Sequence, residues 1–153
     1  RAAGRKVSFS LSDLFCVDRH RQGFRELIDG GRIDILFANE AEILSLAEVA
    51  DLEGAIAQVH SKVETLVITR GAAGALATRG NERVDLAAEP IDEVVDTTGA
   101  GDLFAAGFLY GYAKSKSLGD SLKLGAIAAA EIIQHYGARP EADLKALAGT
   151  LLD

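Results

Sequence analysis

DTTGAGD, residues Asp96–Asp102, and the apolar run LFAAGFLYGYA that follows it decide the fold of this chain. The apolar residues of the run recur at helical spacing, and the glycines before them predict a tight turn at the helix start. The segment EVV, Glu93–Val95, predicts a strand that leads into this turn. The sequence therefore predicts a strand–turn–helix unit centred on Gly99–Gly101.

The turn at Gly99, Ala100 and Gly101 predicts an anion-binding site. The first turn of a helix has unpaired N–H donors and a partial positive charge, so it can hold a phosphate. Asp102 comes directly after the turn, where a carboxylate can take a proton from a hydroxyl that attacks a phosphate. This arrangement favours phosphoryl transfer, with Asp102 as the base.

A purely structural interpretation of the same residues is the alternative. An Asp in the first turn stabilises a helix by about 0.3–1 kcal/mol through the helix dipole alone, and glycine before a helix often only makes a turn. Thr97 and Thr98 place more polar groups here than a single N-cap needs. Together with the strand–turn–helix context, they favour a functional site.

Predicted strands and helices alternate along the remainder of the chain. This alternation predicts an α/β fold, with a mainly parallel sheet covered by helices on both faces. The predicted strands are Lys6–Ser10, Asp34–Ala38 and Thr65–Arg70, with a hairpin that turns at Gly80–Asn81. The predicted helices are Arg19–Gly31, Asn39–Ala47, Asp51–Lys62, Ser117–Gly137 and a last one from Pro140.

Two further motifs follow predicted strands. N-x-x-E, Asn39–Glu42, follows Asp34–Ala38, and T-x-G-x-x-G, Thr69–Gly74, follows TLVI. Taken alone, the first is a helix capping box and the second a glycine turn between strands. Ligands in open α/β sheets collect at the carboxyl ends of the strands. We therefore expect both motifs to converge with Asp96–Asp102 in a kinase site, which needs phosphate donors, a carboxylate for Mg²⁺ and a base.

The composition is that of an ordinary globular domain. Of the 153 residues, 48% are hydrophobic and 25% charged, so a sizeable core can form and disorder is not expected. The 23 acidic against 16 basic residues give a net charge of -7, which disfavours nucleic acid or a membrane surface as a partner. No apolar run has the length of a membrane span and no signal peptide opens the chain, so we expect a cytoplasmic protein.

Cysteine and histidine predict no metal or disulfide chemistry. Cys16 is the one cysteine, which excludes a disulfide framework and favours a buried, inert thiol. The side chains of His20, His60 and His135 lack the spacing of a metal cluster and are expected at the surface or in the core.

Other nucleotide-binding patterns fit less well. The pattern G-x-x-x-x-G-K-[ST] is absent, which excludes a P-loop. GAGDLF approaches the dinucleotide pattern G-x-G-x-x-G, but Phe104 stands at the third small position and Asp102 would lie against the pyrophosphate. A Rossmann-type dinucleotide-binding oxidoreductase is therefore the weaker alternative.

DTTGAGDLFAAGFLYG, Asp96–Gly111, closely resembles the second signature of the PfkB sugar kinases, the ribokinase-like family that includes adenosine kinase. N-x-x-E, T-x-G-x-x-G and the C-terminal YGARP match further family elements in the right order. SLSDLFCVDRHR and ILFANEAE look most like bacterial adenosine-kinase-like chains. The resemblance implies a three-layer αβα ribokinase-like fold, and ATP- and Mg²⁺-dependent phosphorylation of an alcohol group on a nucleoside such as adenosine or on a sugar.

By position, the resemblance implies a role for each residue of the signature. Asp102 would be the catalytic base, and Gly99, Ala100 and Gly101 the anion hole for the transferred charge. Many members also bind a monovalent cation such as K⁺ through backbone carbonyls. The positions that match this cation site are Asp96, Thr98, Ile132, His135 and Gly137.

The other motifs would bind the nucleotide and its metal. The resemblance places Asn39 near the phosphates, and Glu42 would organise the Mg²⁺ shell through water. The residues implied in ATP contacts are Thr69, Gly71 and Gly74. The adenine would lie between Val84–Ile91 and the helix around Ala126, a position where some relatives have a polar side chain.

The resemblance covers essentially the whole chain but only the C-terminal half of the family's domain. The chain opens on Arg1 and contains no methionine, so we expect residues 1–153 to be the ATP-binding and catalytic part of a single ribokinase-like domain. The N-terminal half, which in the family supplies the acceptor site and a small β-sheet lid, would be its partner. Without that lid the fragment alone should be inactive. A homodimer and a catalytically silent nucleotide-binding or regulatory relative remain open alternatives.

Overall fold

The chain folds into two compact units. The computed structural model describes residues 3–152, and all statements of structure below concern these residues. The first unit comprises residues up to 70 together with 76–83, and the second comprises 71–75 together with residues from 84 onward. Among the described residues, no helix combines the length and apolar character needed to cross a lipid bilayer.

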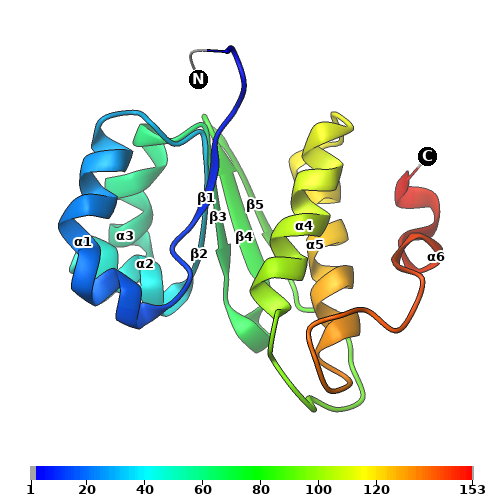
Figure 1. Ribbon diagram of the computed structural model, residues 1–153. Coiled ribbons are helices and arrows are strands. Elements are labelled where there is room, and N and C mark those ends of the chain that lie inside the picture. Colours follow the sequence, from blue (N-terminus) through cyan, green and yellow to red (C-terminus); the bar gives the residue numbers. More distant parts are fainter. Residues whose placement is uncertain (1–2, 153) are drawn as a thin grey trace. The chain divides into compact units, whose positions relative to one another are not determined.

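Five strands and six α-helices follow one another along the chain (Figure 1). The strands are β1 (Ser8–Ser10), β2 (Ile35–Asn39), β3 (Thr65–Thr69), β4 (Ala75–Arg79) and β5 (Glu82–Leu86). The helices are α1 (Leu14–Asp29), α2 (Glu40–Ala47), α3 (Leu52–Val59), α4 (Ala100–Ala113), α5 (Leu118–Ile132) and α6 (Leu144–Ala148). Single 3-10 turns at His60–Lys62, Gly71–Ala73 and Gly149–Leu152 complete the described elements.

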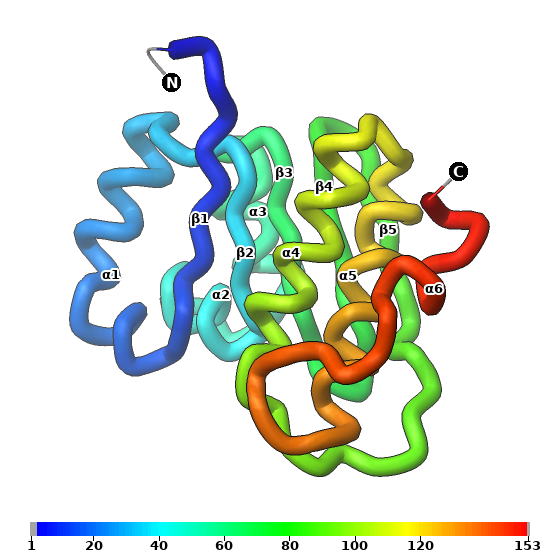
Figure 2. The backbone as a smooth tube through the Cα atoms, turned by 45° about the vertical axis from the view of Figure 1, so that its right-hand side comes forward, coloured from blue at the N-terminus to red at the C-terminus, as the bar shows by residue number. Residues whose placement is uncertain are grey.

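The strands form one sheet in the order β1-β2-β3-β4-β5. Strands β1, β2 and β3 run parallel and side by side, and Asn39 of β2 is the register partner of Thr69 of β3 (Figure 2). The short connection between β3 and β4 requires these neighbours to run antiparallel. The predicted mainly parallel α/β sheet is confirmed for its first three strands, and the predicted hairpin at Gly80–Asn81 joins β4 and β5.

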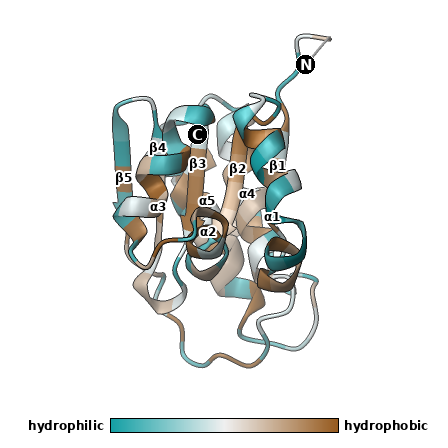
Figure 3. Cartoon of the chain, turned by 90° about the vertical axis from the view of Figure 1, so that its left-hand side faces the viewer, coloured by the Kyte–Doolittle hydropathy of each residue, from teal (hydrophilic) through white to brown (hydrophobic). Residues whose placement is uncertain are grey.

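The core of the first unit lies between the parallel strands and helices α1, α2 and α3. Strands β2 and β3 are almost wholly apolar and are buried along most of their length, as expected for central parallel strands (Figure 3). The fully buried side chains of this core are Leu11, Val17, Leu36, Ile43, Ala55, Leu66, Ile68 and Leu76. This packing fixes the carboxyl ends of β2 and β3, where two of the predicted motifs lie.

Helices α4 and α5 pack closely in the second unit because glycines line their contact (Figure 1). A Cβ on Gly107 of α4 would lie 2.5 Å from the carbonyl oxygen of Leu124. A Cβ on Gly125 of α5 would lie 2.7 Å from the carbonyl oxygen of Phe104. Phe104 is two residues after Asp102, so this contact sets the position of the first turns of α4 against α5.

Several predicted elements differ from the structure, and one of them is α5, which ends at Ile132 and not at Gly137. Glu93–Val95 is not a strand, because the Val95 N–H bonds to the carbonyl of Ile133 at the end of α5 and not to a neighbouring strand. Helix α1 begins at Leu14, five residues before the predicted start, since the Asp13 side chain caps it by accepting from the Cys16 N–H. The last helix begins at Leu144 after an Asp143 cap and not at Pro140.

Candidate active site

The chain enters helix α4 through a left-handed residue. Gly99 has φ 81° and ψ -1°, a conformation that costs little only for glycine, and a Cβ there would lie 2.9 Å from the Cβ of Ala138. An ideal Cβ on Gly101, in contrast, meets no atom within 4 Å. The Gly101 site is therefore open space at the first turn of α4. The Ala100 N–H bonds to the Thr97 carbonyl at 3.2 Å, so it is not a free donor as the predicted anion hole requires. The N–H groups of Gly101 and Asp102 have no partner within the helix, and Asp102 is exposed.

Asp96 holds the segment in front of α4. One of its carboxylate oxygens accepts from the N–H of Thr98 at 2.9 Å and from its hydroxyl at 2.7 Å, and the other accepts from the Gly137 N–H at 3.1 Å. The hydroxyl bond and then the N–H bonds lower the pKa of Asp96. The Asp96 carboxylate therefore ties together two of the loops predicted to bind a monovalent cation.

A buried carboxylate fixes the chain after α5. One oxygen of Glu131 accepts from the N–H groups of Glu141 and Ala142, both at 2.8 Å, and lies 3.1 Å from Nε2 of His135. Burial opposes ionisation of Glu131, but these hydrogen bonds outweigh it and lower its pKa. Burial is also the largest effect on His135 and opposes its charge, but the bond to Glu131, a backbone hydrogen bond at Tyr136 and the charges of Glu141 and Glu131 together raise the His135 pKa.

Asn39 and Glu42 form a complete capping box at the start of α2. The Asn39 side chain accepts from the Glu42 N–H at 2.8 Å, while the Glu42 carboxylate accepts from the Asn39 N–H at 2.9 Å and from its amide nitrogen at 2.7 Å. Burial raises the pKa of Glu42, against the effect of the Asn39 N–H bond. Thr69 lies directly beside Asn39 in the sheet register. Three predicted site residues thus meet at one edge of the sheet.

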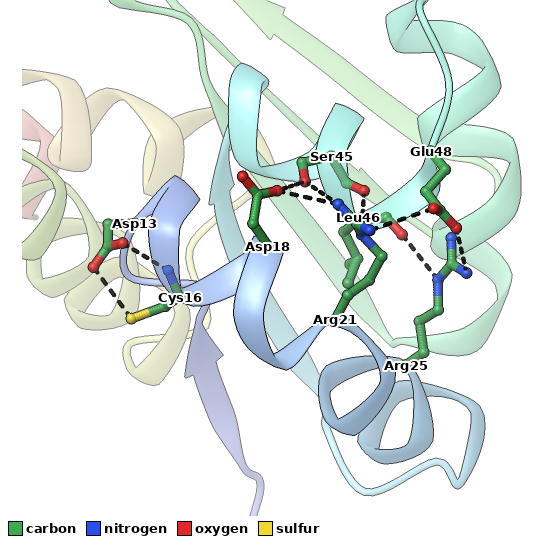
Figure 4. A network of polar contacts seen from close by, with 8 residues as sticks. All are labelled: Asp13, Cys16, Asp18, Arg21, Arg25, Ser45, Leu46 and Glu48. Atoms are coloured by element: carbon green, nitrogen blue, oxygen red, sulfur yellow. Dashed lines mark hydrogen bonds and ion pairs between the residues drawn. The ribbon is translucent and has the colours of Figure 1, made fainter.

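Two arginines of helix α1 contact the C-terminal end of α2. Arg21 donates through Nε to the Ser45 carbonyl and Arg25 through Nε to the Leu46 carbonyl, both at 2.9 Å (Figure 4). Both arginines also pair with Glu48, the left-handed residue that ends α2. Because α2 has no basic residue in its last turn, these two side chains supply the cations that its free carbonyls and dipole favour.

The glycines after Thr69 have different surroundings. Gly71 has open space at its Cβ position, whereas a Cβ on Gly74 would lie 2.0 Å from the Leu86 carbonyl oxygen. Gly74 is therefore needed for close packing against the backbone that follows β5. Ala126 is buried on α5, and the same helix contacts the segment after β5 through a 2.6 Å ion pair between Lys123 and Glu89. The predicted adenine-side elements do lie beside one another.

The structure groups the predicted site residues within each unit. The first unit brings together Asn39, Glu42 and Thr69, and the second groups the residues from 96 to 102 with those from 132 to 138. The convergence of both groups in one site stays a prediction.

Some residues of these clusters were not found from the sequence. Glu131 could have been recognised, because it is a lone acid in the apolar run AIAAAEII.

Cys16 is half-buried and not buried as predicted. Its thiol lies in the first turn of α1 and donates to Asp13 at 3.3 Å (Figure 4).

Comparison with known proteins shows the family of this chain. The profile of the pfkB family carbohydrate kinases matches residues 6–144, and the chain therefore belongs to this family. It is 34% identical to the cytidine kinase of Thermococcus kodakarensis over 142 residues, which are 90% of this chain and 50% of that protein. It therefore spans about half the length of this relative.

Solved structures show the same fold. The adenosine kinase from Sinorhizobium meliloti superposes with a TM-score of 0.93 and 44% identity, covering 96% of this chain and 45% of that one. The ribokinase of Arabidopsis thaliana, solved with ribose and ATP, superposes with a TM-score of 0.78 and 29% identity, covering 98% of this chain and 48% of that one. The ribokinase-like α/β fold expected from the signature is confirmed, and relatives of this chain are sugar and nucleoside kinases.

Proposed function

We propose that this chain is the nucleotide-binding and catalytic half of a kinase that moves the γ-phosphate of ATP to an alcohol group of a nucleoside or sugar. The observation that carries the proposal is the start of α4, where the N–H groups of Gly101 and Asp102 have no helical partner and the Cβ position of Gly101 is open. Donors fixed in this way stabilise the negative charge of a transferring phosphoryl group. Asp102 accepts the proton of the attacking hydroxyl.

The residues present fit a bound magnesium nucleotide. The empty volumes at the Cβ positions of Gly71 and Gly101 are the space that phosphate oxygens need for approach to a backbone. Each Glu42 oxygen accepts one hydrogen bond from Asn39 and keeps a further lone pair, a hard donor of the kind that binds Mg²⁺ through water. Asn39 and Thr69 hold this edge in register. Bound Mg²⁺ would neutralise phosphate charge.

A monovalent cation such as K⁺ is part of the proposal. The candidate positions are Asp96, Thr98, Ile132, His135 and Gly137. Two observations support a shared loop framework at these positions. The Asp96 carboxylate bridges Thr98 and Gly137, and the Val95 N–H bonds to the carbonyl of Ile133.

The acceptor is proposed only as a class, a nucleoside or a sugar. The cytidine kinase and adenosine kinase support a nucleoside, and the ribokinase supports a sugar. Because this chain spans about half the length of these relatives, residues outside it are proposed to form the acceptor pocket.

The test measures ADP production by the intact protein with ATP and Mg²⁺. Candidate acceptors are adenosine, cytidine, inosine, ribose and fructose, and one class should be turned over. The variant Asp102→Asn keeps the size of the side chain but loses the base, so its kcat should fall about 10²- to 10⁴-fold with little change in nucleotide affinity. Transfer activity that survives in the variant would show that Asp102 is not the base. Nucleotide binding without turnover of any acceptor would instead favour a catalytically silent relative.

A further inference from the structure

An ion pair lies directly beyond the ends of β2 and β3. Asn39 and Thr69 are register partners, and the residues that directly follow them, Glu40 and Arg70, form a hydrogen-bonded ion pair. Arg70 donates through Nε to a Glu40 carboxylate oxygen at 3.2 Å. The pair is open to solvent, with 29% of the arginine and 42% of the glutamate side chain exposed. A charged and accessible pair therefore lies beside the residues proposed to meet the nucleotide phosphates.

The chemistry of this guanidinium suits phosphate. Arginine has five N–H donors in a planar fork, and the bond to Glu40 uses only the one on Nε. The fork matches two oxygens of a phosphate, and the charge shortens and strengthens such hydrogen bonds. Arg70 can therefore take a phosphate oxygen through its terminal nitrogens.

Electrostatics at this edge also require a cation. Glu40 and Glu42 both lie in the first turn of α2, and two carboxylates there repel a polyphosphate. Glu40 is joined to Arg70 and 42% of its side chain is exposed, whereas Glu42 is buried. Glu40 thus competes with an incoming phosphate for Arg70, while Arg70 cancels the repulsion from Glu40.

We propose that Arg70 is a further nucleotide-binding residue, which turns from Glu40 to a phosphate of the bound nucleotide. The proposal rests on the proposed function, because it takes the edge formed by Asn39 and Thr69 as the phosphate side of the site. It gives the two partners of one ion pair opposite effects. Loss of Arg70 weakens nucleotide binding, whereas loss of the Glu40 charge leaves binding unchanged or strengthens it.

The test measures the affinity of the intact protein for a non-hydrolysable ATP analogue with Mg²⁺ by isothermal titration calorimetry. Arg70→Ala should weaken binding about 10-fold, since one charge-assisted hydrogen bond is lost. Glu40→Gln should leave the affinity equal or raise it, and added to Arg70→Ala it should recover part of the loss. Arg70→Gln keeps a donor for Glu40 without the charge and should also bind weakly, which covers the case that the alanine variant folds poorly.

The matched control is the pair of Arg79 and Glu82. Its nitrogen–oxygen distance is also 3.2 Å, and its side chains are exposed to 34% and 46%. Arg79 ends β4, which runs back from the Arg70 edge, so Arg79→Ala should bind the analogue like the wild type.

The following results would contradict the proposal. Equal weakening by Arg70→Ala and Glu40→Gln would show that the pair only braces the two strands, and unchanged binding by Arg70→Gln would show that Arg70 does not meet the nucleotide. A wild-type protein that does not bind the analogue overturns the proposed function as well, which separates the two failures.

Discussion

At the scale of single residues, Gly99 and Gly101 are glycines for different physical reasons. Gly99 is required by the backbone, because its φ of 81° and its contact with Ala138 exclude a side chain. Gly101 has ordinary helical surroundings with free space at its Cβ position, so the fold itself tolerates a larger residue there. Because the fold does not require a glycine at this position of the Asp96–Asp102 turn, we infer that a bound ligand needs the space.

Gly101→Val should therefore separate activity from stability. The valine methyl groups would fill the space proposed for the phosphoryl group, and kcat should fall by about 100-fold or more. The free energy of unfolding should change by less than about 1 kcal/mol, because valine is no worse than glycine in a helix. Kinetics and urea denaturation measure the two effects. Gly23→Val is the control, since Gly23 in α1 also has no atom within 4 Å of its Cβ position, and activity should survive there.

Cys16 and Asp13 form a second residue-scale pair. The hydrogen bond to Asp13, then burial and the negative charge, raise the pKa of the Cys16 thiol, so less thiolate exists at a given pH. Asp13→Asn keeps a good N-cap for α1 but removes the charge, and the thiol pKa should fall toward its ordinary value.

The measurement is the rate of alkylation of Cys16 by iodoacetamide between pH 7 and 9. The variant should react faster at the lower pH values and reach half-maximal rate at a lower pH than the wild type, because the thiolate is the nucleophile. Far-UV circular dichroism should confirm that α1 is intact. Identical pH profiles in the two proteins would contradict the role assigned to Asp13.

At the scale of elements, the close contact of α4 with α5 depends on glycines, which have no side chain. Gly125→Ala would place a Cβ 2.7 Å from the Phe104 carbonyl oxygen, and backbone must move to accept it. We expect the free energy of unfolding to fall by about 1–3 kcal/mol. Gly119→Ala on the same helix is the control, since its Cβ would lie 3.8 Å from Val84, an ordinary contact.

Urea denaturation of the intact proteins measures this effect. Gly119→Ala should be as stable as the wild type or slightly more stable, because alanine is the better helix former. If Gly125→Ala is equally stable, the two helices can separate freely and the glycine contact does not set their distance.

The elements also show which signals the sequence carries. Strands β2 and β3 and the start of α2 were predicted to within a residue, because apolar runs and the Asn39–Glu42 box are local. Glu93–Val95 has the composition of a strand, yet the Val95 N–H bonds to the carbonyl of Ile133 at the end of α5, far away along the chain. The early start of α1 was missed because the helix is kinked at His20 (φ -123°, ψ 20°), so its first turns after the Asp13 cap do not continue the amphipathic pattern that begins at Arg19.

At the scale of the whole molecule, the sequence predicts the fold better than the site. The alternation of strands and helices and the signature at Asp96–Asp102 are enough for the α/β fold and the family. The site needs long-range contacts, such as Asp96 with Gly137, Glu131 with Glu141 and Arg70 with Glu40. None of these pairs follows from local periodicity. The nucleotide and acceptor roles of these residues stay predictions.

The capping box of α2 has a consequence for how variation at this protein is interpreted. Asn39 makes three hydrogen bonds with Glu42. A substitution at either position would therefore change both the amount of folded protein and the proposed binding of Mg²⁺. In a mutational scan, selection for yield and selection for turnover would act on the same codons. A sequence lineage that lost the enzymatic role would therefore still keep this asparagine and glutamate, whereas Gly101 would drift.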